Sequence, residues 1–412
     1  MALYSFDKSL ALFERACRVI PSGIPGHTSP AFNVPGSFPY FAQSGKGCRY
    51  KDVDGNEYID FMAAYGPIVL GYNDPVVDAA AQRQREAGGL FNHPTERSVE
   101  LAERLLSLVS DMQWAVFARN GSDVTSYAIS VAREHTQRRK VLMVEGAYHG
   151  VQAWCRSGTG GLIPEDYEHV HTFHWNDATE ALDLVKRYKD DVACIIVTPF
   201  HHPAFGDQVL PAPSFFADLR RICDENGIVL ALDDVRAGFR LSMHGSHAYF
   251  GFSPDLTCFS KAIANGYTLS ACLGKAALKA AASRVFFTGS FFGGAVEMAA
   301  ALATLDELER RDAIAHMMKM GTMLQDGLKG LARARGLEVV VSGPPTIPYM
   351  RFANETNFRR MQRFSGEAAR RGVIFHPHHN WFMMEAHKEE DIRQALDVAD
   401  KCFEVVKKEF GG

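Results

Sequence analysis

Short apolar runs alternate with amphipathic segments through the middle of the chain. The apolar runs have the length of strands and lie at residues 114–119, 141–146, 193–200, 228–235 and 256–261. Runs without polar alternation are typical of strands that are covered on both faces. Segments between them, such as 123–138 and 213–227, carry hydrophobic residues at helical spacing. The pattern predicts an α/β fold with a mostly parallel sheet flanked by helices.

The two ends of the chain show a different pattern. Residues 1–20 predict a helix, 21–41 an irregular Pro/Gly-rich stretch, and 49–62 a hairpin. Toward the C-terminus, a long helical region (295–335) precedes candidate strands at 337–343, 346–353 and around 380–387. We expect these ends to form a smaller α+β lobe. The expected division is an N-terminal segment 1–62 that joins the small lobe, a large domain 63–295, and a C-terminal small domain 296–412.

Composition and charge narrow the class of protein. The chain has 412 residues and a net charge of -4, which does not favour binding to nucleic acid or to an anionic membrane. No apolar run approaches the ~20 residues of a transmembrane helix. Asp7 and Glu14 interrupt the N-terminal apolar stretch, so it does not resemble a signal peptide. The eight cysteines form no CxxC pair, which predicts reduced thiols and a cytoplasmic protein.

Lys261 and Asp233 each end an apolar strand. A lysine in that position is partly desolvated, which lowers the pKa of its amine and favours Schiff-base chemistry. For each residue alone, a simpler explanation is available: Lys261 could reach solvent, and Asp233 could cap the following turn. Together they suit pyridoxal 5'-phosphate (PLP), because a carboxylate next to its pyridine nitrogen keeps that nitrogen protonated.

Two further strand ends carry residues that suit the same cofactor. Gly121 and Ser122 lie between a strand and a helix, where backbone N–H groups and a hydroxyl form a natural phosphate site. The alternative there is a plain helix cap. Tyr148 follows another strand beside glycines and could stack on a ring, and Val235 could pack on its other face. Core packing would explain these two residues equally well.

The order of these motifs is more specific than any one of them. Gly-Ser-Asp, Tyr-His-Gly, Asp-Asp-Val and Ser-Lys occur in the order and spacing of fold type I PLP enzymes. With YKDVDGNEYIDF (50–61), AYGPIVLGYNDP (64–75) and TGSFFGG (288–294), the chain resembles class III aminotransferases of the glutamate-1-semialdehyde aminomutase branch. The resemblance runs from about residue 10 to residue 408.

That resemblance implies a role for each matching residue. Lys261 would hold PLP as a Schiff base, Asp233 would pair with the pyridine nitrogen, and Tyr148 and Val235 would cover the two ring faces. Gly121 and Ser122 would bind the phosphate. Gly289 and Ser290 would reach the phosphate in a neighbouring subunit, which implies a homodimer with shared active sites.

Departures from the aminomutase pattern concern the substrate. The segment SGIPGHTSPAF (22–32) lacks the arginine that holds a substrate carboxylate, and Thr198 replaces the usual Glu. These variants resemble the aminopentol (hydrolysed fumonisin) aminotransferase and its relatives. The resemblance implies an amine:pyruvate transaminase acting on a hydrophobic amine. The aromatic residues that suit such a pocket are Tyr65, Phe91, Phe200, Phe291, Phe292 and Trp381.

Several alternatives remain open from the sequence. An aminomutase would move the amino group within one molecule on the same scaffold, and a regulatory protein could retain the fold without activity. An enzyme that accepts pyruvate must bind its carboxylate, and Arg97, Arg236 and Arg351 are the candidates. The histidines at 376, 378 and 379 cluster in sequence, but their spacing does not indicate a zinc site, and we expect no metal.

Overall fold

A computed structural model of the chain describes residues 3–26, 29–156, 158, 160–203 and 205–411. The chain divides into two compact units. Unit 1 comprises Met1–Asp74, Ala204–Gln208 and Asp312–Gly412, and unit 2 comprises Pro75–Pro203 and Val209–Arg311. The sequence led us to expect domain boundaries at residues 62 and 295, and these boundaries stay a prediction.

Unit 2 is built on a seven-stranded sheet in the order β4-β10-β9-β8-β7-β5-β6. Strands β6, β5, β7, β8 and β9 pair in parallel, whereas β10 is antiparallel to both β4 and β9. The mostly parallel sheet predicted from the sequence is therefore confirmed. The strands are β4 (Trp114–Ala118), β5 (Lys140–Val144), β6 (Val170–Phe173), β7 (Val192–Val197), β8 (Val229–Asp233), β9 (Leu256–Phe259) and β10 (Ser270–Gly274).

Helices surround this sheet because its strands are apolar on both faces. Every residue of β7, β8, β9 and β10 is buried, and α5 packs against all four strands. The helices are α3 (Pro75–Ala87), α4 (Glu96–Leu108), α5 (Gly121–Thr136), α6 (Ala178–Tyr188), α7 (Phe215–Asn226), α8 (Ser246–Phe250), α9 (Lys279–Arg284) and α10 (Ala295–Arg310). Short 3-10 turns are η3 (Pro164–Asp166), η4 (Lys189–Asp191), η5 (Lys261–Ala264) and η6 (Ala276–Leu278).

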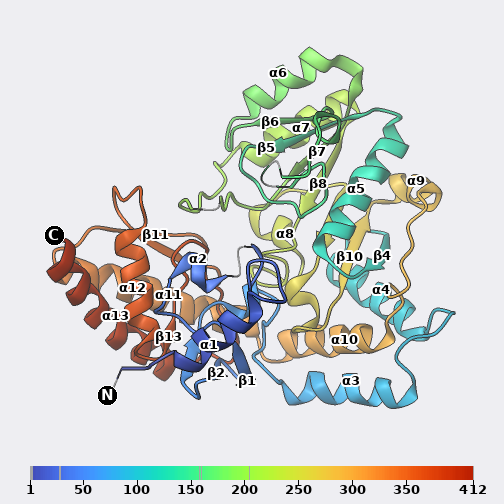
Figure 1. The fold of residues 1–412 in the computed structure, drawn as a ribbon. Coiled ribbons are helices and arrows are strands. Elements are labelled where there is room, and N and C mark those ends of the chain that lie inside the picture. The colour runs from blue at the N-terminus through green and yellow to red at the C-terminus, as the bar shows by residue number, and fades with distance from the viewer. Residues whose placement is uncertain (1–2, 27–28, 157, 159, 204, 412) are drawn as a thin grey trace. The chain divides into compact units, whose positions relative to one another are not determined.

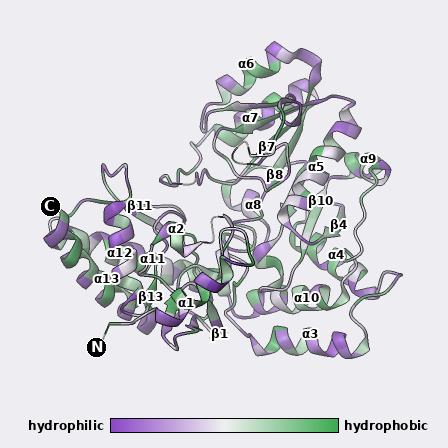
Figure 2. Ribbon diagram, in the orientation of Figure 1, coloured by the Kyte–Doolittle hydropathy of each residue, from purple (hydrophilic) through white to green (hydrophobic). Residues whose placement is uncertain are grey.

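Helices α3 and α10 form a second layer in unit 2, where they lie side by side (Figure 1). Helix α10 is hydrophobic along most of its length, whereas α3 changes from hydrophobic to hydrophilic along its length (Figure 2). The apolar start of α3 buries Val77 and Ala81. Burial of this kind stabilises the pair, because a fully buried valine side chain contributes roughly 1.5–3 kcal/mol.

Unit 1 contains two small sheets and three long helices. Its four-stranded sheet has the order β1-β2-β3-β13, and β11 pairs with β12. The strands are β1 (Ala42–Lys46), β2 (Arg49–Asp52), β3 (Glu57–Asp60), β11 (Val339–Ser342), β12 (Tyr349–Phe352) and β13 (Val373–Ile374). The helical elements are α1 (Asp7–Ala16), α2 (Pro30–Asn33), η2 (Ala63–Tyr65), α11 (Ala313–Ala334), α12 (Arg359–Ala369) and α13 (Glu389–Phe410).

The observed elements differ from the expected ones in three ways. No strand forms around 380–387; the backbone N–H groups of Trp381 and Met383 instead donate to single carbonyls of residues 348 and 346. The helical region 295–335 is two helices, because Asp312 adopts a left-handed conformation (φ 47°) between them. Strands β6 and β10 were not expected. The hairpin at 49–62 is confirmed as β2 and β3.

Among the described residues, no helix is both long enough and apolar enough to cross a membrane.

Candidate active site

Lys261 lies just beyond the carboxyl end of β9, two residues after Phe259. Its backbone is left-handed (φ 45°), a conformation that costs a non-glycine residue roughly 1–2 kcal/mol. Desolvation lowers the pKa of its amine to about 8, the nearby charge of Arg236 acts in the same direction, and Asp233 opposes them. A neutral amine is the reactive form, so this environment activates Lys261 as a nucleophile near neutral pH.

Asp233 ends β8, the strand next to β9, and its side chain is almost fully buried. One carboxylate oxygen, Oδ2, lies 2.8 Å from Nδ1 of His149. The other, Oδ1, accepts the backbone N–H of Val235 at 3.1 Å. These two contacts fix the orientation of the carboxylate.

His149 is a site residue that the sequence reasoning missed. Its ring is buried, and no hydrogen-bond partner is found for its Nε2 among the described residues. The hydroxyl of Thr125 donates to the His149 carbonyl at 2.8 Å, which ties this segment to helix α5. The available signal was its place directly after Tyr148. Nothing in the sequence indicated that its ring would meet Asp233, 84 positions later.

The N-terminus of α5 forms a second part of the site. Gly121 and Ser122 lie in its first turn, where backbone N–H groups have no intrahelical acceptor. Asp123 accepts the N–H of Asn120 at 2.8 Å and so caps the turn itself. The hydroxyl of Ser122 accepts the N–H of Val151 at 3.1 Å, which holds the segment after Tyr148 against the helix.

Close packing joins these parts of the site. A Cβ atom at position 121 would lie 2.9 Å from Cγ1 of Val235, so only glycine fits there without displacement. Tyr148 follows β5 and is 38% exposed, which leaves its ring surface open to a ligand. Six of the residues predicted to contact the cofactor therefore meet at the carboxyl edge of the parallel strands: Gly121, Ser122, Tyr148, Asp233, Val235 and Lys261. Ligands of open α/β sheets bind at this edge.

The charges of this cluster suit an anionic cofactor. Lys261, Arg236 and the fully buried Arg240 are basic, and burial lowers the pKa of Arg240 to about 9. Burial also raises the pKa of Asp234 to about 7, so this carboxyl group is partly protonated at neutral pH and contributes less negative charge to the cluster. A phosphate at the N-terminus of α5 and a pyridine ring beside Asp233 fit the donors, the carboxylate and the net positive charge, so the residues fit PLP.

Gly289 and Ser290 lie on the segment between α9 and α10. Ser290 is exposed, and a Cβ atom at position 289 would lie 2.6 Å from the ring of Phe292. Within the described part of one chain, no hydrogen bond joins either residue to Lys261 or Asp233. Their predicted contact with a neighbouring subunit therefore stays a prediction.

The predicted aromatic residues differ in exposure. In unit 2, Phe91 and Phe291 are 51% and 59% exposed, and Arg119 lies over the Phe291 ring at 5.6 Å. Phe292 is half-buried and packs against the ring of Phe287 at 4.9 Å. Phe200 in unit 2 and Trp381 in unit 1 are 0% exposed. Core packing accounts for these last two, and we do not retain them as substrate contacts.

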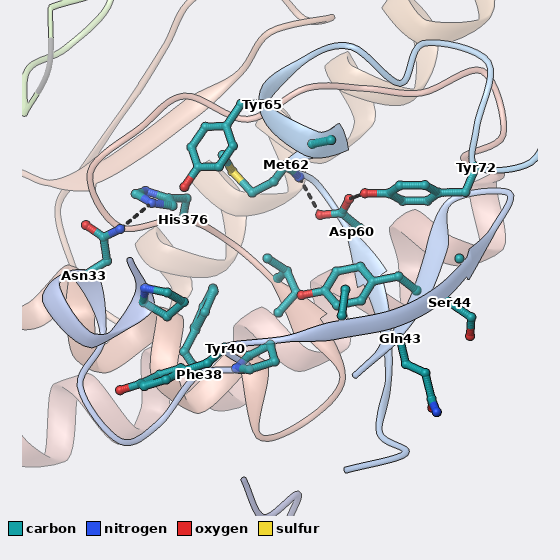
Figure 3. A pocket seen from close by; sticks show the side chains of 17 residues that line it. Asn33, Phe38, Tyr40, Gln43, Ser44, Asp60, Met62, Tyr65, Tyr72 and His376 are labelled. Carbon is teal, nitrogen blue, oxygen red and sulfur yellow. Dashed lines mark hydrogen bonds between the residues drawn. The ribbon is translucent and has the colours of Figure 1, made fainter. Parts of the chain in front are cut away.

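Tyr65 lines a cavity of about 490 Å³ within unit 1. It ends a left-handed turn in which Ala63, Ala64 and Tyr65 have φ values of 48°, 53° and 65°. Asp60 holds this turn, because its carboxylate accepts the N–H groups of Met62 and Ala63 at 2.8 and 3.0 Å. Figure 3 shows Tyr65 and His376 on one side of the cavity and Phe38 and Tyr40 on the other. Most of the lining is aromatic or aliphatic.

The three candidate arginines have distinct environments. Arg97 on α4 forms an ion pair with Glu100 and contacts Gln84. Arg351 in unit 1 holds Asp207 through two bonds of 2.7 and 2.8 Å. Arg236 follows Asp233 by three residues and is the one that influences the pKa of Lys261.

The clustered histidines are engaged with an amide. The side chain of Asn33 lies 3.0 Å from Nε2 of His376 and 3.1 Å from Nδ1 of His378. Burial lowers the pKa of His378 to about 4, so its ring is neutral. No group of three or more His, Cys, Asp or Glu side chains among the described residues has the geometry to hold a metal ion.

Comparison with known proteins identifies the family of the chain. The sequence profile of "Aminotransferase class-III" matches residues 32–402. An aminopentol aminotransferase of Sphingopyxis macrogoltabida is 40% identical over 97% of this chain and 94% of its own length. A 3-aminobutyryl-CoA aminotransferase of Cloacimonas acidaminovorans (strain Evry) is 33% identical over 97% of this chain and 98% of its own.

Solved structures show the same relationship. The FumI protein of Sphingopyxis sp. MTA144, in its PLP internal aldimine form, superimposes with a TM-score of 0.96 at 39% identity, covering 98% of each chain. A glutamate-1-semialdehyde aminomutase of Pseudomonas aeruginosa PAO1 has a TM-score of 0.85 at 21% identity and covers 96% of this chain and 94% of its own, which shows a shared fold. The chain belongs to the class III aminotransferases, enzymes of fold type I that use pyridoxal 5'-phosphate.

Proposed function

We propose that this aminotransferase moves the amino group of a hydrophobic amine to an oxo-acid, with pyruvate as the acceptor. The observation that carries the proposal is the position of Lys261, whose amine pKa is lowered to about 8. It lies just beyond the end of β9, and the neighbouring strand β8 ends in the fixed carboxylate of Asp233. The bound cofactor supplies an electron sink for negative charge that develops at the substrate carbon. The residues of the chain bind and orient the reactants and move the proton.

Lys261 has two tasks in this proposal. Its Nζ would hold the cofactor covalently, and when free it would take the proton from the substrate carbon as a general base. With a pKa of about 8, roughly a tenth of the amine is neutral at pH 7, compared with well under a thousandth for an ordinary lysine. Burial of Lys261 therefore serves both steps.

Asp233 is proposed to hold a proton on the pyridine nitrogen. A fixed carboxylate does this best when it cannot rotate away, and His149 and the N–H of Val235 fix both of its oxygens. The N–H groups of Gly121 and Ser122 are proposed to bind the phosphate at the start of α5, where the helix dipole favours an anion. Tyr148 and Val235 are proposed to cover the two faces of the ring.

A hydrophobic donor is supported by what the chain lacks and by its relatives. The segment 22–32 contains no arginine, although residues 27 and 28 lie outside the described part of the structure. A substrate carboxylate would find no bidentate partner on this segment. The curated relative at 40% identity is named for aminopentol. Tyr65, which lines an aromatic cavity within unit 1, stays a proposed contact. Phe91, Phe291 and Phe292 stay proposed contacts.

We further propose a homodimer in the cytoplasm. Gly289 and Ser290 would complete the phosphate site of the neighbouring copy, and the exposed Phe291 beside them would be covered by that copy. All eight cysteines lie among the described residues and are free thiols, which supports a reducing compartment.

The visible spectrum of the PLP-loaded protein tests the reaction. The probe is 2-aminooctane, followed by pyruvate, with 2-aminooctanoate as a donor of the same chain length that carries a carboxylate. We expect 2-aminooctane to bleach the cofactor band, pyruvate to restore it, and 2-aminooctanoate to react more slowly. Lys261→Ala should retain cofactor through the phosphate contacts and show no turnover. A band that 2-aminooctane leaves unchanged would contradict the donor class. Amino transfer without any acceptor would favour an aminomutase.

A further inference from the structure

Arg119 follows strand β4 and leads directly into the proposed phosphate turn, which comprises residues 120–122. Its backbone N–H donates to Oδ2 of Asp123 at 3.3 Å, and the N–H of Asn120 donates to the same oxygen at 2.8 Å. The first turn of α5 therefore holds the backbone of Arg119. Because the phosphate turn lies between Arg119 and Asp123 in the chain, a displacement of Arg119 also displaces this turn.

The side chain of Arg119 reaches the loop that carries the reactive lysine, residues 260–269. Its Nη1 donates to the carbonyl of Thr268 at 3.0 Å. This lysine loop is closed at its base, where the hydroxyl of Ser260 donates to the carbonyl of Leu269 at 3.0 Å. The bond from Arg119 is therefore made to a part of the loop that is itself held in place.

An ion pair holds the same guanidinium to helix α10. Nη1 of Arg119 lies 2.6 Å from Oε1 of Glu297, which is in the first turn of the helix. The two side chains are only 23% and 20% exposed, so solvent screens this pair less than a pair on the open surface. The turn η5, which begins with Lys261, packs against the same helix. Glu297 thus holds Arg119 to the helix that supports the lysine.

We propose that Arg119 is a positioning residue that sets the separation between the phosphate turn and Lys261. This role rests on the proposed function, in which Gly121 and Ser122 bind the phosphate of the cofactor and Lys261 binds its aldehyde carbon. A rigid molecule that is held at both ends binds tightly only when its two anchors lie at the correct separation. Arg119 contacts both anchors and acts through them.

A second contact of Arg119 offers another route to the site. Its guanidinium lies 5.6 Å from the centre of the Phe291 ring, on the segment that contains Gly289 and Ser290. Phe291 is exposed, and a cation–π contact at an exposed ring is weak compared with a shielded ion pair. The variant Phe291→Leu removes the ring and leaves the contacts with Thr268 and Glu297, so it separates the two routes.

A matched pair of aldehydes tests the role of Arg119. Pyridoxal is PLP without its phosphate, so it can reach Lys261 but has no group to place in the phosphate turn. Full-length protein freed of cofactor is titrated with each aldehyde, and the absorbance of the bound form is followed. Arg119→Gln should weaken PLP binding about 10-fold or more and change pyridoxal binding less than about threefold. Arg119→Lys, which keeps the charge, should recover part of the loss.

Arg104 supplies the control, because its side chain is also 23% exposed and also binds α10. It pairs with Asp306 at 3.1 Å and with Glu309 at 2.6 Å, toward the other end of that helix. Arg104→Gln should therefore leave the binding of both aldehydes unchanged. Glu297→Ala breaks the ion pair of Arg119 from the α10 side and should cause the same selective loss of PLP. The double variant should bind PLP no more weakly than Arg119→Gln alone.

Three results would overturn the proposal. Equal losses of PLP and pyridoxal in Arg119→Gln would mean that Arg119 supports the fold or the lysine loop alone. Unchanged PLP binding would mean that the two anchors do not depend on it. A loss of PLP in Phe291→Leu as large as that in Arg119→Gln would assign the effect to the segment with Ser290. Far-ultraviolet circular dichroism shows whether each variant has folded, and Glu297→Ala replaces Arg119→Gln if the latter does not fold.

Failure of this role and failure of the proposed function are separable. If the wild type binds pyridoxal as tightly as PLP, Gly121 and Ser122 do not form a phosphate site, and the role of Arg119 fails with them before any variant is made. If the wild type prefers PLP and Arg119→Gln keeps that preference in full, the proposed phosphate site stands and only the role of Arg119 is wrong.

Discussion

The imidazole of His149 and the carboxylate of Asp233 meet at 2.8 Å between Nδ1 and Oδ2, with both side chains almost completely buried. This contact joins the segment after β5 to the end of β8. A hydrogen bond to a buried carboxylate is worth more than one at the surface, because neither group can exchange its partner for water. We therefore propose that His149 acts through Asp233, as a positioning residue.

Replacing His149 should loosen Asp233 rather than unfold the protein. We expect His149→Ala to weaken PLP retention and to lower kcat roughly 10-fold or more, because the carboxylate loses a bond worth about 1–3 kcal/mol. His149→Gln, which keeps a donor, should recover part of this loss. His174 and Glu180 lie at the same 2.8 Å distance, but the His174 side chain is 70% exposed. His174→Ala is the control and should leave cofactor binding unchanged.

The lowered pKa of Lys261 predicts how recombination with the cofactor depends on pH. Only the neutral amine attacks, so the rate at which cofactor-free protein binds PLP covalently should rise with pH, with a midpoint near the lysine pKa of about 8. Arg236→Gln removes a positive charge that disfavours protonation of Lys261. The midpoint should therefore move to higher pH in that variant. Stopped-flow absorbance measures both, and a wild-type midpoint near 10.5 would contradict the assigned environment.

Gly121 has a steric requirement that can be tested directly. In Gly121→Ala the new methyl would lie 2.9 Å from Cγ1 of Val235, so the start of α5 or the turn after Asp233 must move. We expect PLP affinity to fall about 10-fold or more, with little change in secondary structure. Gly160→Ala serves as the control, because no atom lies within 4 Å of its Cβ position. Equal cofactor dissociation constants for the two variants would be inconsistent with this packing.

Alanine substitutions at two glycines of α11 should have opposite effects on stability. A Cβ atom at Gly321 would lie 1.8 Å from the carbonyl oxygen of Pro345, whereas nothing lies within 4 Å of that position at Gly330. Gly321→Ala should lower the free energy of unfolding by about 3 kcal/mol through overpacking. Gly330→Ala should raise it by up to about 1 kcal/mol, since alanine favours a helix. Urea denaturation of both variants measures the difference, and destabilisation of similar size in both would refute the packing argument.

Complementation between two inactive variants tests the proposed shared site. If Ser290 completes the neighbouring subunit's site, Ser290→Trp should lose PLP retention and activity although its own Lys261 is intact. A mixture with Lys261→Ala should then regain roughly a quarter of wild-type activity, because half of the dimers are mixed and each has one intact site. Ser283→Trp, on the exposed face of α9, is the control for a bulky surface residue. No recovery in mixtures shown to contain mixed dimers would exclude sharing through Ser290.

Much of unit 2 could be predicted because its strands are simple apolar runs. The strands leading to Asp233 and Lys261 stand out for that reason, and both residues mark strand ends that the parallel sheet brings to one edge. Strand β6 (Val170–Phe173) has a histidine and a threonine at its two central positions and is only partly buried. A hydrophobicity pattern therefore does not reveal it. Strand β10 (Ser270–Gly274) is rich in small residues and escaped notice in the same way.

Unit 1 was less predictable because tertiary contacts decide its local structure. Residues 380–387 are apolar enough for a strand, yet they pack as a buried irregular segment around the ring of Trp381, whose Nε1 donates to the carbonyl of His376. The short strand β13 forms earlier in the chain, at Val373–Ile374, and pairs with β3. In the site, the meeting of His149 and Asp233 depends on how two strands are ordered in the sheet, which a single sequence does not reveal.

The left-handed backbone of Lys261 has an evolutionary consequence. Glycine adopts that conformation without penalty, so a glycine at position 261 would relieve the backbone of roughly 1–2 kcal/mol and also remove a desolvated amine. The residue that would remove the backbone strain at this point is therefore one that cannot perform the reaction. The chain thus keeps a strained backbone at position 261 together with its lysine, and a substitution that relieves the strain would also remove the reactive amine.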